Sequence, residues 1–492
     1  MARILMVSPE AAPLSRVGGL GDFVRGLVVA LARAGHDVRV MVPAYGGTPL
    51  EGTLVHDLDV PYRNRVIPTH VIERTFPGTE RPAYQLAHHG FSDRPGIYGD
   101  GPRDYPDNPI RYGFFCRAAL AWLLRLGWQP DIVHAHDWPA AAAIVHLRTT
   151  CYQHPFFAPV AGIFTFQDLQ FQGIFDGEAM EEADLPADAW HSDALEAYGM
   201  VNLLKGGVAF ADFMTTVSQA YAGEIQREPD LGLGLEHLFA QRHNDLVGIL
   251  KGVDDEAFDP SSDREIGAPF DVSNLAGKKA CREALLREFK LAPSPQGPVI
   301  GVLTRCTVRR GIPILLQVLP RLLAEDVRVV MCGQGDPKLE SDFKMLAARH
   351  PDKLSVTGYP DIHLVHRLYA GSDVLLRPSL HEPCAVPPME GLRYGALVVG
   401  RRVGGMVDSM VEESEGGYAF LYAHPGPESL EGALQRMMAC WASPERWQAA
   451  MKRAMACNFS WDRVAEQYAE VYERAISRRE PAVLPRRAAW GG

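Results

Sequence analysis

Two runs of alternating strand and helix patterns constrain the fold of this chain most strongly. The first run has an apolar strand pattern at residues 4–7, apolar residues at helical spacing over 23–31, and a second buried strand pattern at 38–42. The same order restarts with a strand pattern at 299–304 and a helical pattern at 312–322. Parallel strands need a crossover helix of this kind. The sequence therefore predicts an α/β protein with two Rossmann-like, doubly wound domains.

The length of the chain fits this division, because 492 residues exceed what one hydrophobic core usually holds. A stretch rich in Pro, Ser, Gly and charge covers residues 259–298, and we place the domain junction just before it. Within that stretch, residues 278–289 are expected to form a surface helix. The predicted parts are a first domain over 1–248, a second domain over 249–455, a C-terminal helix over 456–478 that returns to the first domain, and a disordered tail over 479–492.

The composition disfavours several functional classes. A formal net charge of −11 argues against a nucleic-acid binder, which needs a basic surface. No stretch reaches the roughly 18 apolar residues of a membrane helix. Eight scattered cysteines without a CxxC pair fit a reducing compartment. We therefore expect a cytoplasmic protein without membrane or nucleic-acid partners, in which any phosphorylated ligand binds in a local basic pocket.

A glycine-rich turn follows the first strand pattern. It reads Arg16-Val-Gly18-Gly19-Leu-Gly-Asp22 and opens the first predicted helix. Glycines let a backbone approach a pyrophosphate closely, and a helix N-terminus favours anions. The turn matches neither the GxGxxG fingerprint nor a Walker loop. An ordinary structural turn between strand and helix therefore stays as open as a diphosphate site.

Polar residues follow two further strand patterns. His134, His136 and Asp137 come at the end of one, and Gln167 lies in a polar segment after the next. Ligands of α/β sheets bind at the carboxyl ends of strands, and polar groups there can bind sugar hydroxyls. The HxHxD spacing also resembles a metal site, but strand alternation leaves only part of the set on one face. A core position for one of the histidines remains the simpler alternative.

Three arginines, Arg305, Arg309 and Arg310, lie between a strand pattern and a helix pattern of the second run. Positive side chains are unfavourable at the positive end of a helix dipole, so a compensating anion is expected. Guanidinium groups match phosphate oxygens, which favours a bound diphosphate. Solvation at the surface is the alternative.

Two glutamates, Glu382 and Glu390, lie across the start of a predicted helix, and a second glycine pair, Gly404-Gly405, follows a later strand pattern. A carboxylate near Arg305 and Arg310 can bind sugar hydroxyls or stabilise developing positive charge. The glycine amides could face the same diphosphate. Solvated acids beside a capped helix are the alternative.

Together and in this order, these segments resemble the bacterial glycogen synthases and plant starch synthases. The resemblance runs from Ile4 to about Ile476 and includes Gly232-Leu-Gly-Leu-Glu236, Gly252-Val-Asp254 and Ser460-Trp461. Each motif alone is weak, whereas the ordered set is specific. The family's members are retaining glucosyltransferases of the GT-B fold, with two Rossmann-like domains facing a cleft, and they need no metal or cofactor.

The resemblance implies transfer of glucose from ADP-glucose to the non-reducing end of an α-1,4-glucan such as glycogen. It gives the first domain the acceptor and catalytic role and the second domain the nucleotide sugar. The implied catalytic residues are Glu382, Arg305, Arg310, Gln167 and Asp137. The implied donor-binding residues are Arg16, Gly18, Gly19, Lys251, Cys384, Glu390, Gly404 and Gly405.

The sequence departs from the family pattern at five positions on the donor side. Arginine replaces lysine at Arg16 and Arg310, Gln167 replaces a histidine, Lys251 replaces an asparagine, and Ala385 replaces a glycine. Gln167 cannot become a cation near neutral pH, as a histidine can. Two alternatives therefore remain: a retaining transferase with another donor or acceptor, and a weakly active paralogue that binds glucan.

Overall fold

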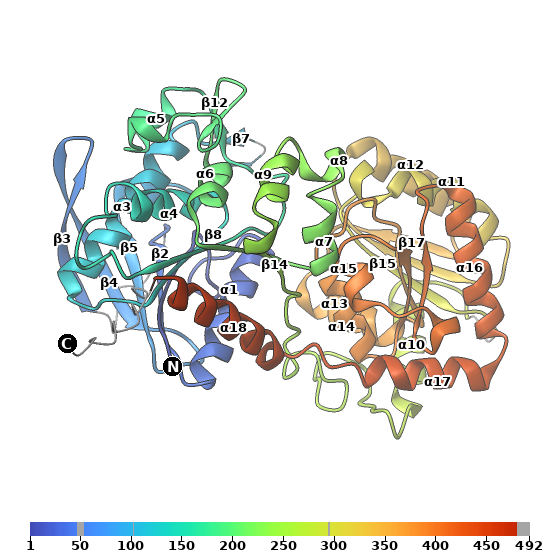
Figure 1. Ribbon diagram of the computed structural model, residues 1–492. Helices are drawn as coiled ribbons and strands as arrows, with labels where there is room; N and C mark the ends of the chain where they lie inside the picture. Colours follow the sequence, from blue (N-terminus) through green and yellow to red (C-terminus); the bar gives the residue numbers. More distant parts are fainter. Residues whose placement is uncertain (47–53, 102, 294–295, 480–492) are drawn as a thin grey trace, which may run out of the picture. The chain divides into compact units, whose positions relative to one another are not determined.

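A computed structural model describes residues 1–46, 54–101, 103–293 and 296–479 (Figure 1). The chain divides into two compact units. The first holds residues 1–216, 225–249 and the chain from 462 onwards, and the second holds 217–224 and 250–461. The predicted junction at 248/249 lies one residue from the main division, and the residues predicted to return to the first domain begin six residues earlier than those that do so. The tail predicted over 479–492 lies outside the described residues beyond Arg479.

The described part of the first unit contains a nine-stranded sheet in the order β14-β13-β9-β8-β1-β2-β5-β4-β3. Neighbouring strands from β14 to β5 are parallel, and β5-β4-β3 pair antiparallel. The bounds are β1 Arg3–Val7, β2 Asp37–Pro43, β3 Leu54–Tyr62, β4 Arg65–Thr75, β5 Pro82–Ala87, β8 Ile132–His136, β9 Ala161–Thr165, β13 Phe213–Thr216 and β14 Leu246–Gly248. The order reverses between β1 and β8, so ligand-binding loops are expected after these strands.

Helices cover both faces of this sheet (Figure 1). Helices α3, α4 and α6 lie together on one face. The bounds are α1 Gly19–Arg33, α2 His89–Ser92, α3 Asn108–Leu126, α4 Ala141–Arg148, α5 Ala179–Glu182, α6 Leu203–Phe210, α8 Pro229–Gly232, α9 Glu236–Gln241 and α18 Trp461–Arg479. Two small antiparallel sheets complete the unit, namely β6 Gly99–Asp100 with β7 Arg103–Asp104, and β10 Ile174–Phe175 with β12 Met200–Asn202 and β11 Glu196–Ala197.

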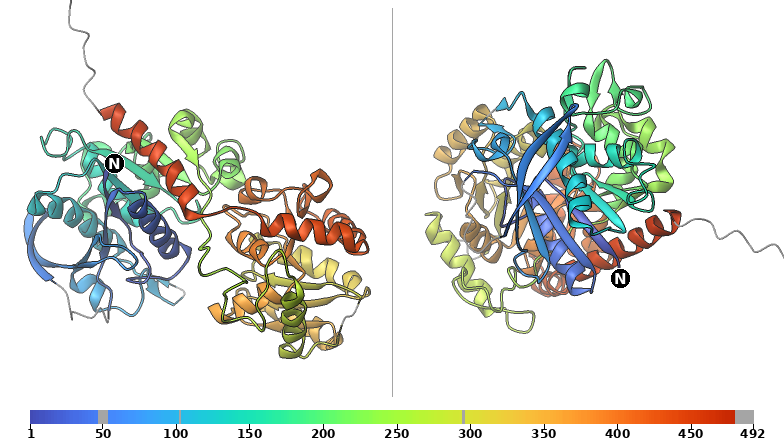
Figure 2. Two further views of the ribbon diagram at one scale, coloured as in Figure 1. Left: turned by 90° about the horizontal axis from the view of Figure 1, so that it is seen from below. Right: turned by 90° about the vertical axis from the view of Figure 1, so that its left-hand side faces the viewer.

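The C-terminal helix α18 packs beside α1 in the first unit, as Figure 2 shows. The ring of Tyr468 lies 6.2 Å from that of Phe23. The hydroxyl of Tyr472 lies 2.9 Å from Nδ1 of the buried His134. The helix ends at Arg479, the first residue of the predicted tail over 479–492.

The second unit contains a six-stranded parallel sheet among the described residues, in the order β17-β16-β15-β18-β19-β20. The strands are β15 Val299–Leu303, β16 Arg328–Cys332, β17 Leu354–Thr357, β18 Val374–Arg377, β19 Leu397–Arg401 and β20 Ala419–Tyr422. The order reverses between β15 and β18, which places the loops after these two strands at the expected ligand crevice. The apolar runs read from the sequence are buried in this sheet.

The helices of the second unit connect these strands. The bounds are α7 Gln219–Glu224, α10 Ala276–Glu288, α11 Ile312–Leu322, α12 Pro337–Arg349, α13 Ile362–Gly371, α14 Val386–Arg393, α15 Gly405–Ser409, α16 Pro427–Trp441 and α17 Pro444–Met455. Helix α10 is a surface helix, as predicted, with one face exposed and the other packed against α13, where Cys281, Leu285 and Leu286 are buried. Lys278 is also buried there, and its Nζ donates to the carbonyl oxygen of Ser372 over 2.8 Å.

Candidate functional site

A buried carboxylate held by two arginines forms the centre of the site in the second unit. Glu382 is 4% exposed and lies between β18 and α14. Its Oε2 accepts hydrogen bonds from Arg310 Nη1 over 3.0 Å and from Arg377 Nε over 2.8 Å, and its Oε1 accepts from Arg377 Nη2 over 3.2 Å. Burial raises the pKa of Glu382, but the charges of Arg377 and Arg310 outweigh that effect and lower the pKa to about 2. The carboxylate is therefore anionic at neutral pH.

The sheet brings these side chains together, because β15 and β18 are neighbours and each is followed by a loop of the site. Arg310 Nη1 also donates to the carbonyl oxygen of His381 over 2.9 Å, which links the two loops. Gly311 has a φ of +70°, and an added Cβ would lie 1.9 Å from the carbonyl oxygen of Pro378. Only glycine permits this approach. Sequence reasoning missed Arg377, whose signal was a charged residue at the end of a buried strand.

Arg305 differs from Arg310 in its surroundings. It follows β15 in the same loop, but its side chain is exposed and makes no hydrogen bond or ion pair within the described chain. Arg310 is partly buried and already paired with Glu382. The two arginines predicted to bind one anion therefore differ in their pairing. The charge of Arg310 is compensated by Glu382, and no described residue compensates the charge of Arg305.

The second glycine pair supports the loop of Glu382. Gly405 N donates to the carbonyl oxygen of Glu382 over 2.8 Å, and Gly404 N donates to Glu224 Oε1 over 2.8 Å. An added Cβ on Gly405 would lie 2.3 Å from the backbone of Cys384. Both amides donate within the protein, and the expectation that they face a ligand stays a prediction.

Three other predicted donor-site residues lie in or near the same loop. Lys251 N donates to Cys384 Sγ over 3.3 Å. Glu390 lies on α14, where its Oε2 accepts a 2.8 Å hydrogen bond from the Tyr369 hydroxyl. Ala385, which replaces the family's glycine, has a φ of +64° directly before α14. The left-handed conformation that glycine adopts freely is therefore kept here by a residue with a Cβ.

Helix α7 belongs to the second unit although the chain on either side of it belongs to the first. Ala220 N donates to Asp408 Oδ2 over 2.9 Å, and the ring of Tyr221 lies 5.5 Å from that of His381. Burial raises the pKa of Glu224, which binds Gly404 from this helix. Glu224 is thus a second supporting residue that the sequence did not reveal, because it lies within the run of elements assigned to the first domain.

Asp137 and Gln167 are brought together in the first unit, at the ends of the neighbouring strands β8 and β9. Gln167 N donates to Asp137 Oδ1 over 2.8 Å, and Asp137 has a φ of +56°. The side-chain Oε1 and Nε2 of Gln167 are both buried without a hydrogen-bond partner among the described residues. Phe166 packs into the core against Phe239. An unsatisfied buried amide is costly, which marks Gln167 as a candidate ligand-binding residue.

The first glycine turn binds a carboxylate of the protein itself. Glu10 Oε2 accepts hydrogen bonds from Val17 N over 2.6 Å and from Gly18 N over 3.1 Å, and Glu10 Oε1 accepts one from the Tyr98 hydroxyl over 2.6 Å. Glu10 therefore accepts the hydrogen bond of the Gly18 amide, and the role of this turn at a diphosphate stays a prediction. Gly19 is the first residue of α1. Arg16 stays exposed and pairs with Asp22 at 2.9 Å.

The two histidines before Asp137 are core residues. His134 Nε2 lies 2.6 Å from Thr165 Oγ1, and burial lowers the pKa of His134. His136 Nε2 lies 3.3 Å from Met6 Sδ. Within the described ranges, no group of three or more His, Cys, Asp or Glu side chains is placed to hold a metal ion. In that same part of the chain, no helix combines the length and apolarity needed to span a bilayer.

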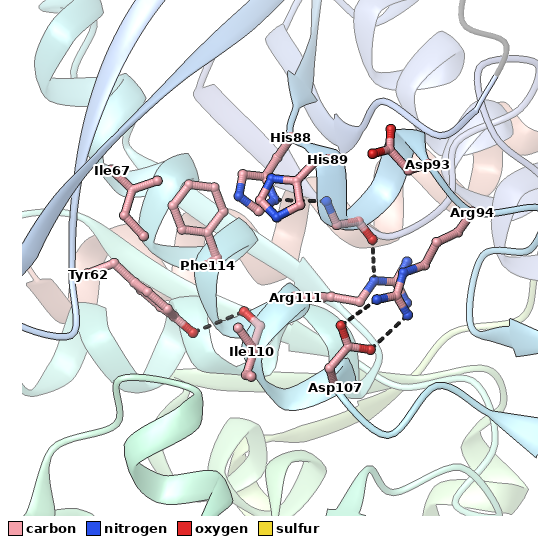
Figure 3. A pocket seen from close by; sticks show the side chains of 11 residues that line it. Tyr62, Ile67, His88, His89, Asp93, Arg94, Asp107, Ile110, Arg111 and Phe114 are labelled. Atoms are coloured by element: carbon pink, nitrogen blue, oxygen red, sulfur yellow. Dashed lines mark hydrogen bonds and ion pairs between the residues drawn. The ribbon is translucent and has the colours of Figure 1, made fainter.

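A cavity of about 340 Å³ in the first unit contains none of the predicted residues (Figure 3). Its cations are already satisfied: Arg94 forms two hydrogen bonds of 2.8 and 2.6 Å with Asp107, and Arg111 Nε donates to Gly90 O over 2.7 Å. Burial lowers the pKa of His88 on its wall to about 4. The residues predicted from the sequence, among them Asp137, Gln167 and Glu382, therefore lie outside this cavity.

Comparisons with known proteins identify the family of both parts of the chain. The starch synthase catalytic domain family matches residues 3–241, and the glycosyl transferases group 1 family matches residues 287–454. The chain is 38% identical to a glycogen synthase of Anaeromyxobacter dehalogenans, over 96% of this chain and 99% of the relative. It is 35% identical to glycogen synthase 2 of Geobacter metallireducens, over 97% and 99%.

A solved structure is similar over the same length. It is the catalytic domain of starch synthase IV from Arabidopsis thaliana, bound to ADP and acarbose. The TM-score is 0.85 at 26% identity, and the match covers 97% of this chain and 100% of that one. The fold is therefore the GT-B arrangement of two Rossmann-like domains. Because the chain is 35–38% identical to these bacterial enzymes over nearly its full length, it belongs to the glycogen and starch synthase family of glycosyltransferases.

Proposed function

We propose that this chain is a glycogen synthase that transfers glucose from ADP-glucose to the non-reducing end of an α-1,4-glucan, with retention at the anomeric carbon. The buried Glu382 between Arg377 and Arg310 is the observation that carries this proposal. Its side chain supplies a fixed anion next to two cations. The chain is also 38% identical to a bacterial glycogen synthase over 96% of its length. The starch synthase neighbour, which binds ADP and acarbose, supports a nucleotide and a glucan as ligands.

In the proposed reaction, the bond from the glucosyl carbon to the diphosphate breaks, and a bond to an acceptor hydroxyl forms. The leaving diphosphate gains negative charge, which Arg305 and Arg310 stabilise in place of a divalent cation. Glu382 stabilises the positive charge that develops on the sugar, because its pKa of about 2 keeps it ionised. The proton of the acceptor hydroxyl is transferred to an oxygen of the leaving diphosphate or to solvent. Asp137 and Gln167 orient the sugar hydroxyls.

We place the reaction in the cytoplasm, which the eight free cysteines of the chain support. The acceptor and catalytic role of the first unit, and the nucleotide-sugar role of the second, are part of the same proposal. So are the thirteen predicted site residues, with two amendments. Gly18, Gly404 and Gly405 act by shaping loops, and Arg377 and Glu224 join as supports of Glu382.

The test is incorporation of labelled glucose into glycogen, with ADP-glucose and UDP-glucose supplied side by side. We expect incorporation from ADP-glucose. Incorporation from UDP-glucose alone keeps the transferase and changes its donor, which the five departures in donor-site residues would then explain. A folded protein that binds glycogen and transfers glucose from neither donor would refute the proposal and support a glucan-binding paralogue.

A further inference from the structure

The cavity of Figure 3 contains none of the residues of the proposed reaction, and its two ends differ in character. Tyr62, Ile67 and Phe114 line one end with ring and aliphatic groups, whereas Arg94 and Arg111 bring guanidinium groups to the other. Its volume of about 340 Å³ suits a small organic molecule. A ligand that fits both ends has an apolar part and a negatively charged part.

Arg111 brings a buried positive charge to this cavity, because only 2% of its surface is exposed. Its Nε donates to Gly90 O over 2.7 Å, its Nη1 to Asn108 Oδ1 over 2.6 Å and its Nη2 to Ile97 O over 3.1 Å. These oxygens satisfy hydrogen bonds of the guanidinium group, but none of them carries a net charge. Burying a charge without an opposite charge is costly, so an anion at this end of the cavity is stabilised.

The other charged groups of the cavity leave the charge of Arg111 in excess. Arg94 and Asp107 pair with each other through two hydrogen bonds of 2.8 and 2.6 Å. Asp93 is exposed, so water screens its charge, and it accepts a 2.8 Å hydrogen bond from the Ser92 hydroxyl. No carboxylate of the described chain forms an ion pair with Arg111. Two buried or half-buried guanidinium groups thus have one paired carboxylate between them.

His88 adds a neutral hydrogen-bond donor to the wall of the cavity. Burial and the neighbouring His89 lower the pKa of His88 to about 4, so its imidazole is uncharged at neutral pH. Its Nδ1 accepts a hydrogen bond from Gly90 N over 3.2 Å, which leaves the proton on Nε2. The cavity therefore offers a second N–H group to an oxygen of a ligand without adding a second buried charge.

The same arginine connects this cavity to the glycine turn before α1. Arg111 Nη2 donates to Ile97 O, and the next residue, Tyr98, donates its hydroxyl to Glu10 Oε1 over 2.6 Å. Glu10 Oε2 in turn accepts from the Gly18 amide over 3.1 Å. An anion that fixes the position of Arg111 therefore also fixes the loop that holds this turn.

We propose that this cavity binds a small organic anion, with its phosphate or carboxylate group at Arg111 and its apolar part at Tyr62, Ile67 and Phe114, and that the bound anion steadies the glycine turn. An organic anion fits better than an inorganic one, because the apolar end gains from burying a ring or an alkyl group. It fits better than a neutral molecule, because the charge of Arg111 has no opposite partner. The site goes beyond the proposed function, since it lies outside the reaction's residues.

The test is calorimetric titration of the whole protein with phenyl phosphate, benzoate, inorganic phosphate and benzyl alcohol. ADP is kept in excess, so that the proposed donor site is filled. We expect phenyl phosphate or benzoate to bind at least about 10-fold more tightly than inorganic phosphate and than benzyl alcohol, because only these two probes use both ends of the cavity. The tighter of the two identifies the preferred charged group.

Ile67→Glu locates the binding without touching Arg111, because it places a carboxylate on the wall of the cavity. The affinity for phenyl phosphate should fall at least about 10-fold through repulsion of like charges. Val66→Glu is the matched control, since Val66 is the neighbouring residue of β4, is 63% exposed and does not line the cavity. Its affinity should equal that of the wild type. Both variants should melt close to the wild type, because neither replaces a buried side chain.

Hydrogen exchange of the amides of residues 9–18 reports on the turn. Exchange should slow when phenyl phosphate binds to the wild type and stay unchanged in Ile67→Glu. Equal exchange with and without the bound probe would overturn the link to the turn.

Two results would overturn the binding site itself. If the folded wild type bound neither phenyl phosphate nor benzoate, Arg111 would serve only to hold the loop. Equal affinity in the wild type and Ile67→Glu would place the anion elsewhere. Neither result depends on glucose transfer, so both leave the proposed function intact. Binding that Ile67→Glu weakens, in a protein that transfers no glucose, would support the inference and refute the function.

Discussion

In the second unit the predicted acid is buried between two arginines that satisfy it, whereas in the first unit the predicted glutamine holds a buried amide that no described group satisfies. Glu382 is fixed by three hydrogen bonds to arginine, and Gln167 is fixed only through its backbone. The difference shows that a site residue can be preorganised by its own protein or left to be completed by a ligand. Substitutions should separate the two cases, because stability and activity change together in the first and in opposite directions in the second.

The largest effect is expected for Glu382→Gln, which should lower turnover by more than about 100-fold, the order found when one preorganised electrostatic group is removed. It should also lower the free energy of unfolding by about 3–5 kcal/mol, because Arg377 and Arg310 lose their buried partner. Steady-state kinetics and denaturant unfolding measure the two changes.

The matched control is Glu412→Gln, since Glu412 is a buried acid paired with Arg436 elsewhere in the same unit. We expect it to lose stability and keep turnover. Equal losses of turnover in both variants would mean that Glu382 acts only through folding, and the comparison between the units would fail.

The charge of Arg377 sets the second expectation, which concerns pH. Glu382 has a lowered pKa, so it stabilises the wild-type fold above its ordinary value of 4.5, and this contribution is lost as the pH falls toward about 2. Arg377→Gln removes the main charge that lowers this pKa while burial remains, so the pKa should rise. The ratio of variant to wild-type turnover should then decrease from pH 8 to pH 5. A ratio that is constant over this range would contradict the assignment.

Gln167→Met tests the other side of the comparison. Methionine has a similar shape and no polar group to satisfy, so the free energy of unfolding should rise by about 1 kcal/mol. Turnover should fall about 10-fold or more, because the amide is then missing from the donor or acceptor complex. Thermal unfolding and kinetics on the same preparation decide between outcomes, and an active, stabilised variant would remove Gln167 from the site.

Ala385→Gly gives the smallest expected effect. The φ of +64° costs an L-residue about 1 kcal/mol, and glycine removes this strain. Glycine also makes the unfolded chain more flexible, which offsets part of the gain, so the melting temperature should rise only slightly. Ala449→Gly, in the exposed middle of α17, should lower stability by about 1 kcal/mol instead. If both substitutions destabilise to the same extent, Ala385 is not strained, and the loop of Glu382 holds this conformation without cost.

The sequence by itself determined the βαβ order, the buried strands and most of the charged residues at strand ends, because hydrophobic period and short motifs are local. It therefore predicted Glu382, Arg310, Asp137 and Gln167 at the ends of the correct strands. Tertiary structure alone decided which groups satisfy them. Glu224 binds the Gly404 amide from a segment 180 residues away, which residue spacing cannot show. Arg377 and Glu10 lie only five and eight residues from Glu382 and Gly18, but the loops must fold before these groups can meet.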